Sequence, residues 1–446
     1  MTARPWLSII LAAGLGTRMK SALPKVMHQI AGQPMVAHVA ATAHAAESAG
    51  LAVVVGPEME SMSKALPDLT PSPAFFVQSE RLGTAHAVLA ARDAIAGFDG
   101  DVVILYGDTP LIRPATITRL LGALADGAGV AVLGFEAADP TGYGRLVLDD
   151  GGTLRAIRED KDASPDERAI RLCNSGIMAF RAAHMLPILD RIGRANAKGE
   201  YYLTDAVEIA RASGIGVVVE TCAEQEVMGV NDRAQLAIAE SIMQRRLRLA
   251  AMEHGATLIA PETVTFSYDT QLGRDVIVEP NVFFGPGVTV EDNVHIKANS
   301  YMERAHIRLG AIVGPFARLR PGADIGEDVH IGNFVEVKQA TIEKGSKANH
   351  LTYIGDARVG PKVNIGAGTI VCNYDGFNKH FTDIGAGAFI GSNSALVAPV
   401  KIGEGAYVGT GSVITRDIEP NALALERNDL KQIPGWAARF RARHGK

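Results

Sequence analysis

The segment Ile384-Gly-Ala-Gly-Ala-Phe389 and its continuation Ile390-Gly-Ser-Asn-Ser-Ala395 repeat one pattern, a branched apolar residue followed mostly by small or polar ones. The apolar residue returns at every sixth position as far as Ile414. A period of six fits neither the helical period of about 3.6 residues nor the two-residue alternation of a strand. It is typical of hexapeptide repeats, in which each repeat forms a short flat strand and a turn. The pattern therefore predicts a parallel β-helix.

The same period covers much of the second half of the chain. Three hexapeptides are expected to close one triangular coil, and successive coils stack about 4.8 Å apart. Anchors eighteen positions apart, such as Ile384 and Ile402, should then lie over one another. The anchors are Val278, Phe284, Val290, Ile296, Met302, Ile307, Val313, Leu319, Ile325, Ile331, Val337, Ile384, Ile390, Leu396, Ile402, Val408 and Ile414.

The period breaks between Val371 and Ile384, which lie thirteen positions apart. The extra residues fall in Cys372–Thr382, a polar and aromatic segment that must leave the coil as a loop. Loops on rigid scaffolds commonly carry binding and catalytic residues. One alternative is that the β-helix is only a stiff spacer. Polar residues in and near this region favour a functional site: Arg320, Lys338, His350, Tyr353 and Asn364.

Composition limits the class of protein. The chain has 446 residues, 47% of them hydrophobic, and a net charge of −5, so no basic surface indicates a nucleic-acid partner. Three cysteines without C-x-x-C spacing argue against a zinc cluster or a disulfide framework. The apolar run from Trp6 to Ala13 is too short for a membrane span. We therefore expect a cytoplasmic protein without a membrane span.

The first half opens on a predicted strand, residues 7–12, followed by Ala13-Gly-Leu-Gly-Thr-Arg-Met19 and then Lys25. A glycine-rich turn after a strand brings backbone N–H groups close to phosphate. The segment is not a Walker A loop, because no Gly-Lys-Ser/Thr ends it, and Met19 replaces the third glycine of a dinucleotide fingerprint. An ordinary turn is the alternative. The cations Arg18 and Lys25 favour a phosphate site.

Helices and strands alternate beyond this loop, which predicts a parallel α/β sheet. We expect a helix at 34–49, strands at 51–55, 75–77 and 102–108, and another helix from Ala85. Ligands of such sheets bind beyond the carboxyl ends of the strands. Gly14, Gly83 and Asp108 all stand at such ends, so their loops should converge on one cleft.

Asp108 directly follows the last of these strands, where its carboxylate suits a magnesium ion held together with phosphate. The alternative is a helix N-cap, because Asp-Thr-Pro often begins a helix. Asn231 has the same alternative, since a long helix is predicted at 233–252. Between these residues lie four polar motifs that suit the sugar half of a cleft: Thr141–Arg145, Arg158–Asp162, Asn174–Gly176 and Glu200–Asp205.

Taken together, these motifs resemble a known family. Leu11-Ala-Ala-Gly-Leu-Gly-Thr-Arg-Met19 with Pro24-Lys25 resembles the opening motif of sugar-phosphate nucleotidyltransferases. Three motifs of the β-helix narrow the resemblance to the bacterial bifunctional N-acetylglucosamine-1-phosphate uridyltransferase and glucosamine-1-phosphate acetyltransferase: Gly332–Lys338, Lys344–Tyr353 and Asn364–Gly368.

The resemblance implies an α/β Rossmann-like nucleotidyltransferase domain at 1–228 and a linker helix at 229–252. A left-handed β-helix acetyltransferase domain at 253–420 and a tail at 421–446 would follow. It also implies a homotrimer, with the acetyl site between subunits. The implied small-molecule partners are UTP, glucosamine-1-phosphate, N-acetylglucosamine-1-phosphate and acetyl-CoA, with Mg²⁺ as cofactor and acetyl-CoA as co-substrate.

Residue roles carry over by position. Arg18 and Lys25 would be catalytic in uridyl transfer, His350 would be the base of acetyl transfer, and Asp108 with Asn231 would bind Mg²⁺. The UTP and UDP-sugar residues would be Leu11, Ala12, Ala13, Gly14, Lys25, Gln78, Gly83, Thr84, Tyr106, Gly107, Asp108, Gly144, Glu159, Asn174 and Asn231. The amino-sugar phosphate residues would be Arg320, Lys338, Tyr353, Asn364 and Lys379. The acetyl-CoA residues would be Ala367, Asn373, Tyr374, Ser392, Thr410 and Arg427.

The chain departs from the family pattern in four places. Leu15 replaces a charged residue of the opening motif, Asn349 replaces a glycine before His350, and Thr410 replaces an alanine. The β-helix also has about two hexapeptides fewer than well-known members. Two other hypotheses remain: a nucleotidyltransferase for another sugar or base with a structural β-helix, and a trimeric scaffold with a degenerate nucleotide-binding domain.

Overall fold

The computed structural model describes residues 4–57, 62, 66, 71–427 and 429–444. The chain divides into two compact units, Met1–Gln244 and Arg245–Lys446. The long helix α8, Arg233–Glu253, begins in the first unit and ends in the second.

The first unit is built on a sheet whose main path runs β11-β7-β10-β6-β1-β4-β5, with β8 and β9 attached beside β10. A short pair, β2 Gln29–Ile30 and β3 Gln33–Pro34, lies outside it. The strands of the main sheet are β1 Trp6–Leu11, β4 Gly50–Val55, β5 Ala74–Val77, β6 Asp101–Tyr106, β7 Val130–Glu136, β8 Arg145–Leu148, β9 Leu154–Arg158, β10 Leu172–Arg181 and β11 Val217–Thr221.

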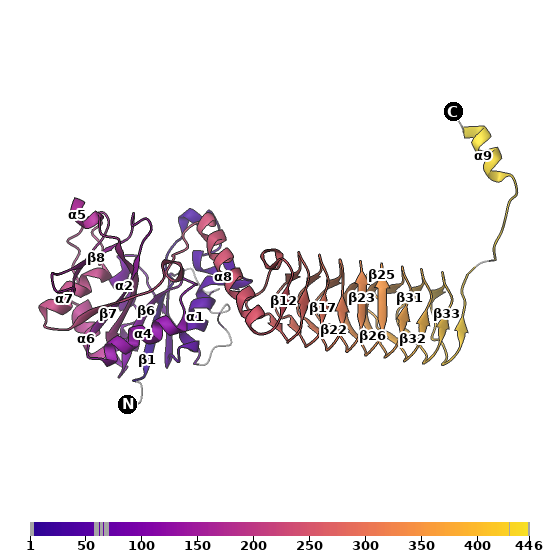
Figure 1. Ribbon diagram of the computed structural model, residues 1–446, viewed down its shortest axis with the longest axis horizontal. Helices are drawn as coiled ribbons and strands as arrows, with labels where there is room; N and C mark the ends of the chain where they lie inside the picture. Colours follow the sequence, from indigo (N-terminus) through magenta and orange to yellow (C-terminus); the bar gives the residue numbers. More distant parts are fainter. Residues whose placement is uncertain (1–3, 58–61, 63–65, 67–70, 428, 445–446) are drawn as a thin grey trace. The chain divides into compact units, whose positions relative to one another are not determined.

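Helices cover both faces of this sheet, as Figure 1 shows. Strand residues alternate between two apolar cores, one shared with α1 and α4 and the other with α2, α6 and α7. Consecutive strand residues such as Ile9 and Ile10 are both fully buried, because each face has its own core. The helices before α8 are α1 Met35–Ala45, α2 Thr84–Leu89, α3 Arg92–Ala96, α4 Pro114–Ala125, α5 Pro165–Arg168, α6 Ala182–Leu189 and α7 Ala206–Ala212.

The expected strands and helices of the first half are present, and the prediction of a parallel sheet is confirmed for these strands, while the sheet as a whole is mixed. Strand β10 runs antiparallel to both β6 and β7. It follows the hairpin β8–β9, so the chain returns to the sheet without the helical crossover that a parallel strand needs. Strands β1, β4, β5 and β6 are parallel neighbours, and their carboxyl ends therefore share one edge.

The second unit is the predicted parallel β-helix, with strands in three stacks (Figure 1). All the sequence anchors from Val278 to Ile414 are at most 3% exposed. Ile384 pairs with Ile402, as the eighteen-residue period predicts. Asparagine and aspartate occupy many of the corners in the left-handed backbone region, for example Asn293 at φ 59° and Asp328 at φ 55°. These residues tolerate positive φ better than most.

The stacks follow the sheet order. Stack 1 contains β12 Thr257–Leu258, β14 Ile277–Val278, β17 His295–Ile296, β20 Ile312–Val313, β23 His330–Asn333, β25 Lys347–His350, β27 Asn364–Ile365, β30 Phe389–Ile390, β33 Tyr407–Val408 and β35 Leu423–Ala424. Stack 2 contains β13 Gln271–Leu272, β16 Thr289–Val290, β19 Ala305–Ile307, β22 Ala323–Ile325, β29 Thr382–Ile384 and β32 Val400–Ile402. Stack 3 contains β15 Phe283–Phe284, β18 Tyr301–Met302, β21 Arg318–Leu319, β28 Ile370–Cys372, β31 Ala395–Val397 and β34 Val413–Ile414.

Two longer strands, β24 Glu336–Ile342 and β26 Tyr353–Val359, continue from stack 3 into stack 2. They occur where the anchor step shortens from six residues to five, so the chain crosses that corner without a separate turn. The predicted insertion is also present: Ile370 pairs with Ala395, twenty-five positions away. Inside it, Tyr374 and Lys379 form an antiparallel bridge, so the loop is a small hairpin. The chain ends in helix α9, Trp436–His444, whose side chains are exposed.

Candidate functional site

A pocket of about 320 Å³ opens at the carboxyl edge of β1, β5 and β6 in the first unit. Gly14, Gly83 and Asp108 all line it, so the predicted convergence of three loops is observed. The predicted nucleotide residues in its wall are Leu11, Ala12, Ala13, Gly14, Lys25, Gln78, Gly83, Thr84, Tyr106 and Asp108.

Glycines give the pocket its shape. A Cβ atom on Gly14 would meet no other atom within 4 Å, so this backbone faces open space and a phosphate can approach it closely. Gly83 has φ 123°, and a Cβ there would lie 2.5 Å from the carbonyl oxygen of Tyr201. Buried Gln78 donates from Nε2 to the Gly83 carbonyl at 3.3 Å. The wall beside Gly83 is therefore fixed by backbone packing.

The ammonium of Lys25 lies at the centre of the charged part of the site. It forms an ion pair with Oδ2 of Asp108 and donates to Oδ1 of Asn231 at 3.1 Å. Asp108 is not a helix N-cap, because α4 begins only at Pro114. Asp232 accepts from the backbone N–H of Gln235 at 2.9 Å and caps α8, which leaves the Asn231 side-chain oxygen free for Lys25.

Two oxygens thus converge on one cation, and this donor set fits Mg²⁺. Magnesium prefers hard oxygen ligands and usually takes one or two carboxylates, with phosphate and water completing its shell. No cluster of three or more His, Cys, Asp or Glu side chains suited to a metal occurs among the described residues. A magnesium ion at Asp108 and Asn231 would therefore depend on the phosphates of a nucleotide.

The remaining predicted residues of this half lie around the pocket. Gly107 donates its N–H to the carbonyl of Leu11 at 2.9 Å. Asn174 is buried and donates its N–H to the carbonyl of Gly144 at 2.7 Å. Burial raises the pKa of the Glu159 carboxyl, although Thr204 donates a hydrogen bond to it at 3.4 Å.

Tyr106 lies near both Glu159 and Asp108. Burial raises the pKa of its phenol well above the usual value, and the charges of Asp108 and Glu159 add to the effect. Arg18 is exposed on the 3₁₀ turn Thr17–Met19, and Leu15 is 59% exposed.

Sequence reasoning did not single out Arg81 of this pocket. Arg81 lines it and donates from Nε to the carbonyl of Ala13 at 2.9 Å, which braces the glycine loop. Glu200, the first residue of the predicted motif Glu200–Asp205, also lines the pocket. Arg81 lies in the segment that follows β5. Its positive charge in a segment that leads to a predicted phosphate-binding loop could have identified it from the sequence.

The second unit gathers cations at the border of stacks 2 and 3. Arg320 donates to Glu336 at 2.8 Å, and Glu336 lies opposite Tyr353 on the next coil. Lys379 comes from the inserted hairpin, and its contact with Lys338 lowers the pKa of the Lys338 ammonium. Two ammonium groups held together favour an anion between them, and a sugar phosphate supplies one.

His350 stands on β25 of stack 1, on the coil that follows Lys338. Its Nδ1 lies 2.8 Å from Oδ1 of Asn333, directly opposite on the preceding coil. Since the amide oxygen only accepts, this contact places the proton on Nδ1 and leaves Nε2 free to act as a base. Asn333 is a positioning residue that the sequence motif contained but did not single out.

The predicted acetyl-CoA residues form a column that starts at His350. The N–H of Asn393 donates to Ala367 at 2.7 Å, and the N–H of Gly411 donates to Ser392 at 2.8 Å. Arg427 then donates to the carbonyl of Thr410 at 3.2 Å. Ala367, Ser392 and Thr410 thus occupy equivalent positions on successive coils, which suits an elongated ligand.

The other two predicted acetyl-CoA residues lie in the hairpin region. Asn373 hydrogen-bonds Asp356, and its Nδ2 lies 3.5 Å from the hydroxyl of Tyr353. The Tyr374 hydroxyl donates to Gly376 at 2.5 Å within the hairpin. Asn364 points outward from stack 1 opposite Lys347 and Phe389, so register places it one coil beyond the strand of His350.

A glycine column runs beside the acetyl-CoA column. Cβ atoms on Gly366 and Gly391 would each lie 2.5 Å from backbone nitrogen of the next coil, and one on Gly332 would lie 1.9 Å from the carbonyl oxygen of Asn349. The coils therefore leave no room for a side chain at these glycines. Asn349 interrupts the column next to His350, and its backbone does not require positive φ.

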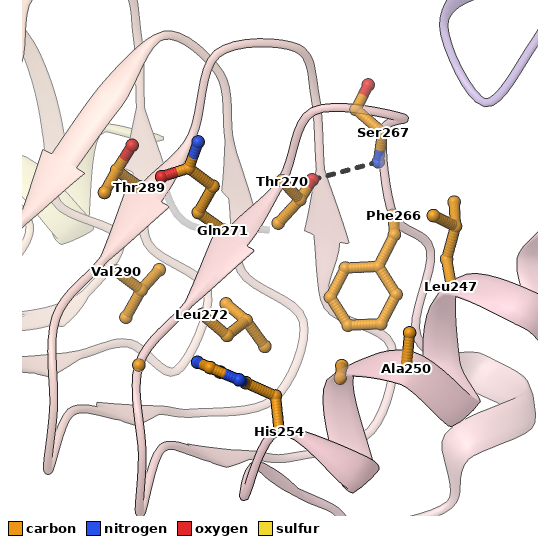
Figure 2. Close-up of a pocket in the computed structure, with 12 residues that line it drawn as sticks. Leu247, Ala250, His254, Phe266, Ser267, Thr270, Gln271, Leu272, Thr289 and Val290 are labelled. Carbon is orange, nitrogen blue, oxygen red and sulfur yellow. Dashed lines mark hydrogen bonds between the residues drawn. The ribbon is translucent and has the colours of Figure 1, made fainter. Parts of the chain in front are cut away.

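A separate pocket of about 460 Å³ lies between the last turns of α8 and the first coils, as Figure 2 shows. Its walls combine apolar and polar side chains, with Leu272 close to His254 and with Leu247 and Phe266 on another side (Figure 2). None of the predicted site residues lines it.

Replacing Lys338 by methionine tests the cation cluster. We expect the KM for glucosamine-1-phosphate to rise about tenfold, which corresponds to the loss of one charged hydrogen bond. If Ala367, Ser392 and Thr410 bind acetyl-CoA as predicted, its KM should change less, because these three residues lie on other coils. Initial rates of thiol release at varied substrate concentrations measure both constants. An unchanged KM for the sugar phosphate would show that the phosphate binds elsewhere.

Fold and sites together define a nucleotidyltransferase joined to a hexapeptide-repeat transferase. A family model for the MobA-like NTP transferase domain matches residues 8–171. A model for the bacterial transferase hexapeptide, six repeats, matches residues 381–416.

Full-length relatives narrow the class. The Bifunctional protein GlmU of Azorhizobium caulinodans is 61% identical over 446 residues, which cover 100% of this chain and 99% of the relative. The proteins of the same name from Xanthobacter autotrophicus and Paramagnetospirillum magneticum are 59% and 56% identical, over 100% and 97% of this chain and 99% and 96% of their own. The chain belongs to the family of bifunctional GlmU proteins.

Proposed function

We propose that the two units catalyse two consecutive steps. The second unit transfers acetyl from acetyl-CoA to glucosamine-1-phosphate. The first unit then transfers UMP from UTP to the N-acetylglucosamine-1-phosphate so formed, releasing pyrophosphate and giving UDP-N-acetylglucosamine, a cell-wall precursor. The observation that carries the proposal is the presence of both sites on one chain: the Lys25–Asp108–Asn231 cluster and the His350–Asn333 pair beside Lys338 and Lys379.

For uridyl transfer, two anions must be brought together. Backbone N–H groups around Gly14 and the cations Lys25 and Arg18 would bind the phosphates of UTP, while Gln78, Gly83 and Thr84 would hold the uracil end. Gly144, Glu159 and Asn174 would orient the sugar phosphate for attack in line. Magnesium would supply further positive charge at the α-phosphate. Positioning and electrostatic stabilisation are the main sources of rate in such transfers.

For acetyl transfer, the amine of glucosamine-1-phosphate must lose a proton before it attacks the thioester. Arg320, Lys338 and Lys379 would hold the phosphate, and Tyr353 with Asn364 the sugar. Nε2 of His350 would accept the proton as the C–N bond forms, and the C–S bond then breaks to release CoA thiol. Ala367, Asn373, Tyr374, Ser392, Thr410 and Arg427 would hold acetyl-CoA along its column.

Substrate dependence tests the proposal against its main alternative, a nucleotidyltransferase for another sugar or base. Pyrophosphate release should require UTP and N-acetylglucosamine-1-phosphate, and ATP or glucose-1-phosphate should not replace them. Thiol should be released from acetyl-CoA only when glucosamine-1-phosphate is present. Pyrophosphate release from ATP and glucose-1-phosphate without any thiol release would favour the alternative.

We also propose that the protein is a homotrimer that works in the cytoplasm, where UTP and acetyl-CoA are available. No helix in the described part of the chain is long and apolar enough to cross a membrane. The trimer is supported by a corner column beside His350, made of Phe316, Phe334 and Leu351, which are 48%, 56% and 59% exposed. All three have positive φ, at 56°, 56° and 50°. Large apolar residues are unfavourable in that conformation, so an interface that buries them is the expected reason for them.

Sedimentation equilibrium tests this assembly. The parent protein should have the mass of three chains. Replacing Phe316 and Phe334 by aspartate should give monomers that lose acetyl transfer and keep uridyl transfer, because charges in a buried apolar interface are costly. Leu309→Asp is the control, since Leu309 is 43% exposed and lies outside the column. A parent monomer with full acetyl transfer would contradict both the trimer and a site between subunits.

A further inference from the structure

The ammonium of Lys25 occupies the point at which a metal ion would bind. Oδ2 of Asp108 and Oδ1 of Asn231 both contact Nζ of Lys25. These are the two oxygens that fit magnesium, so one cation already satisfies both. The side chains of Lys25 and Asp108 are only 13% and 19% exposed, so water screens their attraction weakly.

The backbone of Asp108 and the side-chain amide of Asn231 are held by contacts that do not involve Lys25. The N–H of Val230 donates to the backbone carbonyl of Asp108 at 2.9 Å, which joins the two ligand segments. The backbone N–H of Asn231 donates to Gln235 at 2.7 Å, and Nδ2 of Asn231 faces the carbonyl of Gly229 at 3.4 Å. The Asn231 amide is thereby oriented with Oδ1 toward the shared point. A cation that replaced Nζ would find the Asn231 oxygen already oriented and the Asp108 carboxylate on a fixed backbone.

The Lys25 ammonium can also reach a second position, beside the glycine loop. Its stem packs against Gly16, where a Cβ would lie 2.4 Å from the Cβ of Lys25, and the residue lines the nucleotide pocket together with Gly14 and Arg81. The stem is therefore fixed at its base. The four-carbon side chain can still turn its ammonium from Asp108 toward phosphates bound at the glycine loop.

We propose that Lys25 is a placeholder cation: in the free enzyme it neutralises Asp108 and donates to the amide oxygen of Asn231, it is displaced when magnesium enters with the nucleotide, and it then binds the phosphates. This proposal rests on the proposed magnesium site. Two cations cannot share the same two oxygens, so Lys25 opposes metal binding when no phosphate is present. Once phosphates are bound, Lys25 can pair with them and no longer competes with the metal for the two oxygens. The free enzyme should bind the metal weakly, and metal and nucleotide should strengthen one another's binding.

Binding of Mn²⁺, measured by electron paramagnetic resonance of the free ion, tests the proposal without any catalysis. Without nucleotide, Lys25→Met should bind Mn²⁺ about tenfold more tightly than the parent, the factor for one charged hydrogen bond removed from competition. With UTP present, Lys25→Met should instead bind Mn²⁺ more weakly than the parent, since the variant lacks the ammonium that would bind the phosphates. Lys25→Arg keeps the charge and should not bind Mn²⁺ more tightly than the parent.

Two control variants distinguish a failure of the placeholder role from a failure of the proposed magnesium site. Lys20→Met removes one positive charge from the same loop, where Lys20 is exposed, and should leave Mn²⁺ affinity nearly unchanged. Asp108→Asn should abolish Mn²⁺ binding at this site. If Asp108→Asn binds Mn²⁺ as the parent does, the magnesium site itself is wrong. If it loses Mn²⁺ and Lys25→Met binds no more tightly than the parent, the site stands and the placeholder role is overturned. Circular dichroism of each variant establishes that the fold is intact.

Discussion

Replacing Asp108 by asparagine is expected to lower uridyl transfer at least about 100-fold, the scale at which a lost electrostatic stabiliser acts. Asparagine keeps the shape and a side-chain oxygen but removes the charge that would hold magnesium. Acetyl transfer should be unchanged, because Asp108 belongs to the first unit and His350 to the second. Pyrophosphate release from UTP and N-acetylglucosamine-1-phosphate measures the first activity, and thiol release measures the second.

Asp126→Asn is the matched control, since Asp126 is an exposed acid at the end of α4 in the same unit. It should keep both activities. Equal loss of both activities in Asp108→Asn, with the fold intact, would show that the two sites are not separate. Full uridyl transfer in that variant would remove Asp108 from the metal site.

Replacing His350 by alanine is expected to lower acetyl transfer by about 100- to 10,000-fold, the usual contribution of a general base. Uridyl transfer from supplied N-acetylglucosamine-1-phosphate should persist. The imidazole stands on a rigid coil and is oriented by Asn333, so its loss should not disturb neighbouring coils.

His295→Ala is the control for this variant, because His295 is another outward histidine of stack 1, paired with Glu279 at 2.8 Å. It should keep acetyl transfer. Near-normal acetyl transfer in His350→Ala would assign the base to water or to another residue.

Much of the fold followed from the sequence because the β-helix is periodic. A single inward residue at every sixth position determines the anchors, the coil stacking and the place of the inserted hairpin. The first unit was less predictable. The direction of β10 depends on how the hairpin β8–β9 returns the chain to the sheet, which local patterns do not contain.

The sequence likewise predicted some residues of the sites and not others. Strand ends gave Gly14, Gly83 and Asp108, because the edge of a parallel sheet brings such ends together. Arg81 and Asn333 were missed because their importance arises only from tertiary contacts, with Ala13 and His350. The alternatives for Asp108 and Asn231 needed the structure as well, since only the position of the helix starts excludes their capping roles.

A complementation assay tests most directly that one chain carries two independent sites. Asp108→Asn and His350→Ala are each given glucosamine-1-phosphate, acetyl-CoA, UTP and Mg²⁺, first alone and then mixed, and UDP-N-acetylglucosamine is measured by mass spectrometry. Each variant alone should form almost none, whereas the mixture should form it, because the first variant supplies N-acetylglucosamine-1-phosphate to the second. A mixture that forms no product, although each variant keeps its remaining activity, would contradict the account.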